Sequence, residues 1–357
     1  MKIRVFTILI LMIVSGLAED KLRYTNATEL RIQGTAFSVA EKENPFHRLP
    51  RYAQELVRRE VWDLSTNSAG IFIDFYTNSS FLKLKWEVTK NFTMEHMAGT
   101  GIRGLDLYCK NKGKWQYVAT AKSAGKVSEK VIIENMSGTM KEFRLYLPLY
   151  DGIESLEIGI HADAQIEKGQ AYSEKPLVFY GTSITQGGCA SRPGMAYPNI
   201  ISRKLDKNCI NLGFSGNGWL QEPMARILAG IEADMIVLDC LPNMTIKMVH
   251  ENIPKAIDII RQKQPQVPIV LVENINYETN YFNFLQYQDI YDKNGALRYE
   301  FNQLMENNYR NIYLLSAKGL IGLDHEGTVD GVHLTDLGFL RFAENFIARL
   351  KKQGLIK

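Results

Sequence analysis

Cysteine is scarce in this sequence, and its cysteines lack the spacing of a metal site. The four residues are Cys109, Cys189, Cys209 and Cys240. No C-x-x-C pair and no Cys/His zinc spacing occurs among them, so the sequence predicts neither a structural zinc nor another metal. In an oxidising compartment these cysteines could pair, and free buried thiols are the alternative.

An excess of charge of one sign is missing as well. Lysine and arginine total 42 and aspartate and glutamate total 39, which gives a net charge of +3. These residues are spread along the chain without the basic stripe that is typical of nucleic-acid binding. We therefore expect no nucleic-acid partner, and charge by itself identifies no other partner.

The sequence also lacks an apolar run of the roughly 20 residues that cross a bilayer as a helix. The N-terminus instead carries Lys2 and Arg4, a short apolar stretch at 5–13, and small residues up to Ala18 before Glu19. This order is typical of a secretory signal peptide, predicted here for residues 1–18 with cleavage after Ala18. We expect a periplasmic or extracellular protein with no membrane insertion after cleavage.

Residues 19–165 carry short strand patterns without helical periodicity between them. Apolar residues alternate along each segment, and turn clusters such as 77–80 and 111–113 separate the segments. This spacing predicts a β-sandwich of jelly-roll-like form over residues 19–165. The predicted strands are 71–76, 81–88, 105–109, 115–119, 130–133, 143–147 and 156–160.

Strands and helices alternate in a second domain, predicted for residues 170–357, after a polar stretch at 163–175 that predicts a linker. The alternation predicts a three-layer α/β/α domain with a parallel sheet, whose ligands bind at the carboxyl ends of the strands. Continuous apolar runs, typical of strands buried on both faces, occur at 177–180, 209–212, 235–240, 269–272 and 312–315. The main helical patterns cover 245–264, 284–307 and 336–351.

Small and polar residues follow three of these predicted strands. Ser183 lies on the turn after the first strand, where N–H groups at a helix start can stabilise an anion. Gly216 follows the second strand and Asn243 follows the third. Each is an ordinary cap or turn residue when taken alone. Their shared position after consecutive strands is what matters, because it places all three at the edge of the sheet where ligands bind.

An acid and a histidine follow the last predicted strand, in Asp330-Gly331-Val332-His333. At this spacing the carboxylate can hold one imidazole nitrogen while the other nitrogen accepts the hydroxyl proton of Ser183. A surface histidine is the ordinary alternative, and His325 is the nearest competitor. The pattern favours nucleophilic catalysis by Ser183, with Thr335 as the expected N-cap of the final helix.

The four segments resemble the ordered sequence blocks of the SGNH, or GDSL-like, hydrolases, and they cover most of the second domain. The resemblance implies a flavodoxin-like sheet order and a serine nucleophile at position 183. It also implies a triad completed by His333 and Asp330, and an oxyanion hole formed by Ser183, Gly216 and Asn243. This chain departs from the usual motifs at Thr182, where the family commonly has aspartate, and around Pro242.

The first domain carries a second resemblance. Residues 104–108 read Gly-Leu-Asp-Leu-Tyr, similar to the GxDLY signature of the β-sandwich module that precedes one subfamily of secreted bacterial esterases. Asn243 also starts an N-glycosylation sequon. A glycan there would block the predicted site, which favours a bacterial setting.

Together these resemblances imply a secreted serine esterase that hydrolyses short acyl esters, acetyl first, on carbohydrate. The predicted mechanism is an acyl-enzyme without a cofactor or metal, and the predicted partner is a small-molecule or glycan ester; no oligomeric state is implied. A lipase or acyl-thioesterase of the same fold, and a non-catalytic glycan-binding protein, are the alternatives. Trp219 would line the acyl pocket and residues 277–292 would frame it. His47 and Arg48 would contact substrate, unless their loop only packs the domains together.

Overall fold

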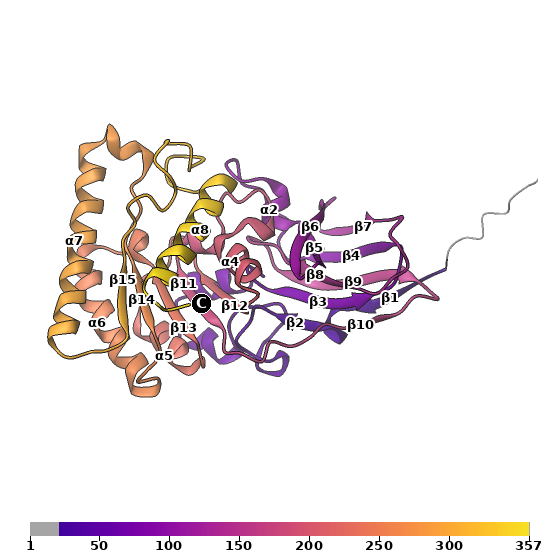
Figure 1. Cartoon of the computed structure of the whole chain (residues 1–357), viewed down its shortest axis with the longest axis horizontal. Helices are drawn as coiled ribbons and strands as arrows, with labels where there is room; N and C mark the ends of the chain where they lie inside the picture. Colours follow the sequence, from indigo (N-terminus) through magenta and orange to yellow (C-terminus); the bar gives the residue numbers. More distant parts are fainter. Residues whose placement is uncertain (1–20, 357) are drawn as a thin grey trace, which may run out of the picture.

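The computed structural model describes residues 21–356 and arranges them in two parts (Figure 1). Antiparallel sheets make up the first part, and a parallel sheet covered by helices makes up the second. The signal peptide predicted for residues 1–18 lies outside the described residues. None of the helices between residues 21 and 356 combines the length and apolar character that spanning a membrane requires.

Two antiparallel sheets packed on one apolar core form the first part, which confirms the predicted β-sandwich. The strands are β1 (Leu22–Asn26), β2 (Arg31–Gln33), β3 (Phe72–Thr77), β4 (Leu82–Val88), β5 (Leu105–Asn111), β6 (Lys114–Ala121), β7 (Val127–Ile133), β8 (Lys141–Tyr146), β9 (Ile153–His161) and β10 (Ile166–Lys168). One sheet has the order β1-β9-β4-β7, and the other has the order β10-β3-β8-β5-β6 with β2 paired to β3. Strand β4 alternates buried and partly exposed residues, as expected for a strand with one face on the core.

Three short strands were not indicated by the sequence pattern. β1 pairs with β9, β2 pairs with β3, and β10 lies inside the segment 163–175 that the sequence predicts as a linker. Edge strands of three to five residues bury few side chains, so they carry little alternation for a pattern to detect. Two short helices that the sequence pattern did not indicate, α1 (Arg59–Ser65) and α2 (Gly99–Arg103), also lie in this part of the chain.

The second part is a five-stranded parallel sheet with the order β12-β11-β13-β14-β15, which confirms the predicted flavodoxin-like order. Its strands are β11 (Leu177–Gly181), β12 (Cys209–Gly213), β13 (Met235–Asp239), β14 (Ile269–Val272) and β15 (Ile312–Leu315). β11 lies between β12 and β13, so the strand order reverses at β11. Such a reversal opens a crevice at the carboxyl ends of the neighbouring strands.

Helices cover both faces of the parallel sheet. They are α4 (Tyr197–Leu205), α5 (Glu222–Gly230), α6 (Ile246–Lys263), α7 (Phe284–Glu306) and α8 (Asp336–Lys352). Val178 and Tyr180 of β11 join the core beneath α5, α6 and α7, whereas Leu177 and Phe179 join the core beneath α4 and α8. Burial on both faces explains the continuous apolar runs of these strands. Thr335 caps α8 by accepting from the Gly338 N–H, as predicted.

The GxDLY signature fastens the sandwich to the α/β part. The two leucines of the signature point into the sandwich core, so Asp106 and Tyr108 face the other side of β5. Asp106 accepts hydrogen bonds from the Arg192 guanidinium and the Gly194 N–H, both at 2.8 Å, and the Tyr108 hydroxyl lies 2.6 Å from the same guanidinium. Arg192 and Gly194 belong to the loop that follows Ser183, so the signature anchors a neighbour of the predicted site.

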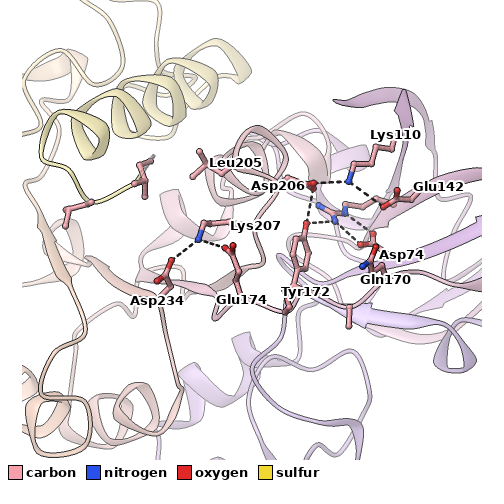
Figure 2. A pocket seen from close by; sticks show the side chains of 15 residues that line it. Asp74, Lys110, Glu142, Gln170, Tyr172, Glu174, Leu205, Asp206, Lys207 and Asp234 are labelled. Atoms are coloured by element: carbon pink, nitrogen blue, oxygen red, sulfur yellow. Dashed lines mark hydrogen bonds and ion pairs between the residues drawn. The ribbon is translucent and has the colours of Figure 1, made fainter. Parts of the chain in front are cut away.

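A polar cavity of about 610 Å³ lies between the two parts (Figure 2). Its charged groups pair with one another. Lys110 of the sandwich bonds Asp206 at 2.8 Å, and Lys207 bonds Glu174 at 2.7 Å and Asp234 at 2.9 Å. Asp206 and Asp234 precede β12 and β13, so this cavity lies at the amino ends of the strands. The cavity therefore lies at the opposite end of the sheet from Ser183, and the ion pair between Lys110 and Asp206 joins the two parts there.

Candidate active site

Ser183 is the first residue of α3 (Ser183–Gln186), directly beyond the carboxyl end of β11. Thr182 has extended backbone, and its hydroxyl accepts a hydrogen bond from the Ile184 N–H at 3.3 Å. Thr182 therefore caps this helix, in the place where the family motif commonly has aspartate. The Ser183 hydroxyl is not used for capping and is available for other contacts.

The segment that precedes α8 brings the predicted acid and histidine to Ser183. Asp330 Oδ1 accepts hydrogen bonds from the backbone N–H groups of Val332 and His333 at 3.0 and 2.7 Å. Asp330 Oδ2 lies 2.7 Å from His333 Nδ1, and His333 Nε2 lies 2.9 Å from Ser183 Oγ. Three side chains predicted to act together thus form one hydrogen-bonded row.

The charge of Asp330 suits this row. Partial burial raises the pKa of its carboxyl. Hydrogen bonds from the His333 ring and from the N–H groups of His333 and Val332 lower the pKa by more than burial raises it, so the pKa lies below its ordinary value. An ionised carboxylate at Nδ1 favours the imidazole tautomer that carries its proton there. The lone pair of Nε2 then faces Ser183 Oγ, as a general base requires.

His325, the competing histidine, is engaged elsewhere. Its Nδ1 lies 2.7 Å from Glu278 Oε2, and its ring packs edge-on against Tyr281 at 4.5 Å between centroids. The structure therefore selects His333 of the two.

Three donors with no hydrogen-bond partner among residues 21–356 lie on the loops around Ser183. They are the N–H groups of Ser183 and Gly216 and the side-chain amide nitrogen of Asn243. Asn243 Oδ1 accepts from the Gly218 N–H at 3.2 Å, which ties the loop after β13 to the loop after β12. A Cβ on Gly218 would lie 2.5 Å from the Gly181 carbonyl oxygen, so this loop packs directly on the end of β11. Gly216 has φ +69°, which favours glycine.

Gly188 lies directly against the His333 ring. A Cβ on Gly188 would lie 2.9 Å from the Tyr150 hydroxyl, and 3.1 Å from both His333 Cδ2 and the Ser183 carbonyl oxygen. A side chain at this position would press on the imidazole and on the backbone of Ser183 together, so both would have to shift.

We expect Gly188→Ala to lower kcat by about 10- to 100-fold, because a shift of the imidazole lengthens its contact with Ser183 Oγ. KM should change less than kcat. Steady-state hydrolysis of a small ester measures both values. Gly125→Ala is the matched control, since a Cβ there meets nothing within 4 Å. Wild-type kcat in a folded Gly188→Ala protein would contradict this account of the ring's position.

The structure corrects the substrate contact predicted for Arg48 and His47. The Arg48 guanidinium donates to the carbonyl oxygens of Asn67 at 2.9 Å and Gly213 at 2.6 Å, and the residue is only 2% exposed. His47 is 7% exposed and packs edge-on against Trp62. Arg48 therefore joins the sandwich to the end of β12, and both side chains are buried, in agreement with the alternative that their loop packs the domains together.

Trp219 lies beside the Gly216 loop. Its indole N–H donates to the Gly216 carbonyl oxygen at 3.0 Å, and the Arg58 guanidinium lies 3.6 Å above its ring. Its role in lining an acyl pocket stays a prediction. Arg58 lies in a segment without periodic pattern, so the sequence held no signal for its approach to this loop.

Two further residues that the sequence did not indicate lie close to His333. The ring of His96 is 5.6 Å from the His333 ring, and Cys189 has a left-handed backbone with φ +70°. Potential ligand atoms of these two residues, Asp330 and His333 all lie within 4.8 Å of one another, so the group could hold a soft divalent cation. Burial and the nearby Asp330 raise the pKa of Cys189 to about 12. A bound cation would have to displace that thiol proton and draw His333 away from Ser183. All four cysteines are free thiols.

Asp239, at the end of β13, is a buried acid behind the Ser183 turn. Its carboxylate accepts hydrogen bonds from the hydroxyls of Tyr197 at 2.9 Å and Thr185 at 3.1 Å. Burial raises its pKa from 3.8 to about 7, although these two hydrogen bonds act in the opposite direction. Between about pH 4 and pH 7 the folded protein keeps a proton that the unfolded chain has released. Stability is therefore expected to fall as the pH rises through this range and to level off above it.

We expect Asp239→Asn to remove this pH dependence, which corresponds to about 4 kcal/mol at most. Thermal melting at pH 5 and pH 8 measures it. The wild-type melting temperature should be lower at pH 8 than at pH 5 by several degrees more than that of the variant. Asp163→Asn, at an exposed position, is the control. Equal pH dependence in wild type and Asp239→Asn would rule out Asp239 as its source.

Family models match both parts of the chain. The model described as the GDSL-like lipase/acylhydrolase family matches residues 174–351, and the GxDLY model, described as the N-terminus of SGNH-hydrolase-type esterases, matches residues 22–166. A search of curated proteins finds no match.

Solved structures of similar proteins extend over nearly the whole chain. A structure described as a GDSL-like lipase from Bacteroides ovatus ATCC 8483 is 40% identical, has a TM-score of 0.91, and aligns over 94% of this chain and 99% of its own. A salicylyl-acyltransferase from a tetracycline biosynthetic pathway is 19% identical over 93% and 98%, with a TM-score of 0.76. A family two carbohydrate esterase from Clostridium thermocellum, in complex with cellohexaose, is 12% identical over 81% and 94%, with a TM-score of 0.60. The last two likenesses show the fold alone.

Proposed function

Because the chain belongs to the GDSL-like lipase/acylhydrolase family, we propose that it is a secreted serine esterase that removes short acyl groups, acetyl first, from carbohydrate. The proposal assigns Ser183 as nucleophile, His333 as general base and Asp330 as the residue that orients the imidazole. One observation carries these roles, namely the hydrogen-bonded row in which His333 lies 2.9 Å from Ser183 Oγ and 2.7 Å from Asp330 Oδ2.

In the first half of the proposed reaction, Ser183 Oγ attacks the ester carbonyl while His333 Nε2 takes the hydroxyl proton. The negative charge that forms on the carbonyl oxygen is stabilised by the N–H groups of Ser183 and Gly216 and by the Asn243 amide. His333 then returns its proton to the departing sugar oxygen, which leaves an acyl group on Ser183. A water molecule gives a proton to His333 and attacks this acyl group; the bond to Ser183 Oγ then breaks, His333 returns the proton to Oγ, and the acid is released. No step requires a cofactor.

Carbohydrate is proposed as the substrate class on two grounds. The two-part architecture is shared with carbohydrate esterases, one of which was solved in complex with cellohexaose. A secretory signal would also deliver the enzyme to a compartment where acetylated glycans are met. These grounds support a glycan ester over a long-chain lipid as partner.

The substrate proposal is tested by comparing kcat/KM on acetylated xylo- and cello-oligosaccharides with kcat/KM on aryl esters of acetate and laurate. We expect the acetylated oligosaccharide to exceed the laurate ester by about tenfold or more, a difference of about 1.4 kcal/mol in transition-state binding. Faster turnover of laurate would make the protein a lipase. Glycan binding without hydrolysis of any ester would make it a binding protein.

Secretion is proposed from the residues that precede Glu19. We expect the protein expressed with its full sequence in a bacterial host to be processed after Ala18. N-terminal sequencing of the exported protein should therefore begin at Glu19. An intact Met1 on the protein found in the cytoplasm would contradict both the cleavage and the location.

A further inference from the structure

Large apolar side chains gather, exposed, where the chain leaves β14 and enters α7. Exposed fractions reach 94% for Phe282, 80% for Leu285 and 71% for Phe284. We call this group the aromatic platform, and its members are Tyr281, Phe282, Phe284, Leu285, Tyr287 and Tyr291. Contiguous exposed apolar groups of this kind mark a binding surface more often than a structural one.

The aromatic platform is hollowed. A cavity of about 280 Å³ is lined by Tyr281, Phe282, Phe284 and Tyr287 together with two amides, Asn276 and Asn280. A second cavity of about 380 Å³ shares Asn276, Tyr281 and Tyr287 with the first. Apolar and aromatic walls with a few polar groups are the usual composition of a small-molecule site.

Asn280 carries polar groups that no protein atom satisfies. The residue is only 6% exposed, and neither its side-chain oxygen nor its side-chain nitrogen has a hydrogen-bond partner among residues 21–356. A buried amide without a hydrogen-bond partner has lost its contacts with water and gained nothing in return, which destabilises the fold. An amide that lines a cavity can recover this cost by binding a ligand with hydroxyl groups, which both donate and accept.

Through the short helix before it, the platform lies next to the loop that carries Asp330. Its first residue, Tyr281, ends the short helix η6 (Glu278–Tyr281). The Glu278 N–H donates to the Gly331 carbonyl oxygen at 3.1 Å, and a Cβ on Gly331 would lie 3.1 Å from the Thr279 methyl group. Gly331 follows Asp330, so η6 lies between the platform and the loop that carries the acid of the triad.

We propose that the aromatic platform and Asn280 form a subsite for the sugar rings of the substrate, on the leaving-group side of the scissile ester. This inference rests on the proposed function. Flat aromatic faces pack against the apolar C–H faces of pyranose rings, while the Asn280 amide and the tyrosine hydroxyls bind sugar hydroxyls. An acyl chain would satisfy the rings but leave the Asn280 amide unpaired, which is why a sugar fits better.

The test compares an acetylated oligosaccharide with ethyl acetate, which has no group to reach the platform. For Phe282→Ala and Tyr281→Ala, the ratio of kcat/KM on the oligosaccharide to kcat/KM on ethyl acetate should fall by about tenfold or more, mainly through KM. Tyr299→Ala is the matched control, an exposed tyrosine further along α7 that lines neither cavity. Phe282 is almost fully exposed, so its removal leaves the fold intact.

A binding measurement tests the contribution of the Asn280 side-chain amide separately from catalysis. In the Ser183→Ala background, calorimetric titration with the deacetylated oligosaccharide should show weaker affinity after Asn280→Leu and after Phe282→Ala, but not after Tyr299→Ala. Unchanged ratios and affinities in the platform variants, with wild-type enzyme active on the oligosaccharide, would overturn the subsite alone. Wild-type enzyme that hydrolyses ethyl acetate but no sugar ester would overturn the proposed function instead. If the platform variants lost kcat/KM on laurate esters alone, the platform would bind an acyl chain, and the sugar subsite would be overturned.

Discussion

Ser183→Ala is expected to lower esterase turnover by on the order of 10⁶-fold, the loss typical of removing a serine nucleophile that acts with a histidine base. The reason is that His333 Nε2, 2.9 Å from Ser183 Oγ, then has no hydroxyl proton to accept and no acyl-enzyme forms. Residual hydrolysis would come only from the oxyanion donors and from binding. Release of acid from an aryl acetate, followed at saturating substrate, measures the loss.

The control for this variant is Ser155→Ala, which removes an exposed serine from β9 of the sandwich and should leave turnover unchanged. A serine-directed phosphonate should label the wild-type protein once and leave Ser183→Ala unlabelled. Full esterase activity in Ser183→Ala would sink the mechanism proposed for this chain, whatever its substrate.

Asp330→Asn is expected to lower kcat by about 10⁴-fold, because the substitution changes the imidazole tautomer. An asparagine can still accept the backbone N–H bonds of Val332 and His333 through its carbonyl oxygen, so the loop should keep its shape. Its amide nitrogen would face His333 Nδ1 as a donor. The ring proton then moves to Nε2, and the nitrogen that faces Ser183 can no longer accept a proton.

The matched control is Asp324→Asn, in the loop that leads toward Asp330. Asp324 pairs with Arg341 at 2.6 Å, and half of its side chain is exposed, so its loss should cost little stability and no activity. The substrate affinity of Asp330→Asn should stay near that of the wild type. If Asp330→Asn retained more than about a tenth of wild-type kcat, with an unchanged melting temperature, Asp330 would not be the residue that sets the tautomer.

Much of the site could be predicted because it depends on local features that sequence displays. Ser183, Gly216 and Asn243 each follow a continuous apolar strand, and parallel strands of one sheet end at the same edge. Asp330 and His333 are three positions apart, which suffices for a carboxylate to reach its own histidine. The burial of β11 on both faces is likewise visible as an uninterrupted apolar run.

Other parts carried no such signal. His96 and Arg58 come from irregular segments, and their approach to His333 and Trp219 depends on how the sandwich docks on the α/β part. Arg48 could be read equally as a substrate contact or as a packing residue. Its burial against backbone carbonyls of two chain segments decides between them, and nothing in the neighbouring residues encodes that burial.

The amino-acid sequence by itself determined the alternation of strands and helices in the second part and the identity of the hydroxyl, imidazole and carboxylate, since periodicity and turn chemistry act over a few residues. Tertiary structure alone decided that Ser183 and His333, 150 positions apart, meet at 2.9 Å, that Gly188 leaves room for the ring, and that Asn280 faces a cavity unpaired. The physical reason is that such contacts depend on close packing between distant segments, and packing is a property of the folded chain as a whole.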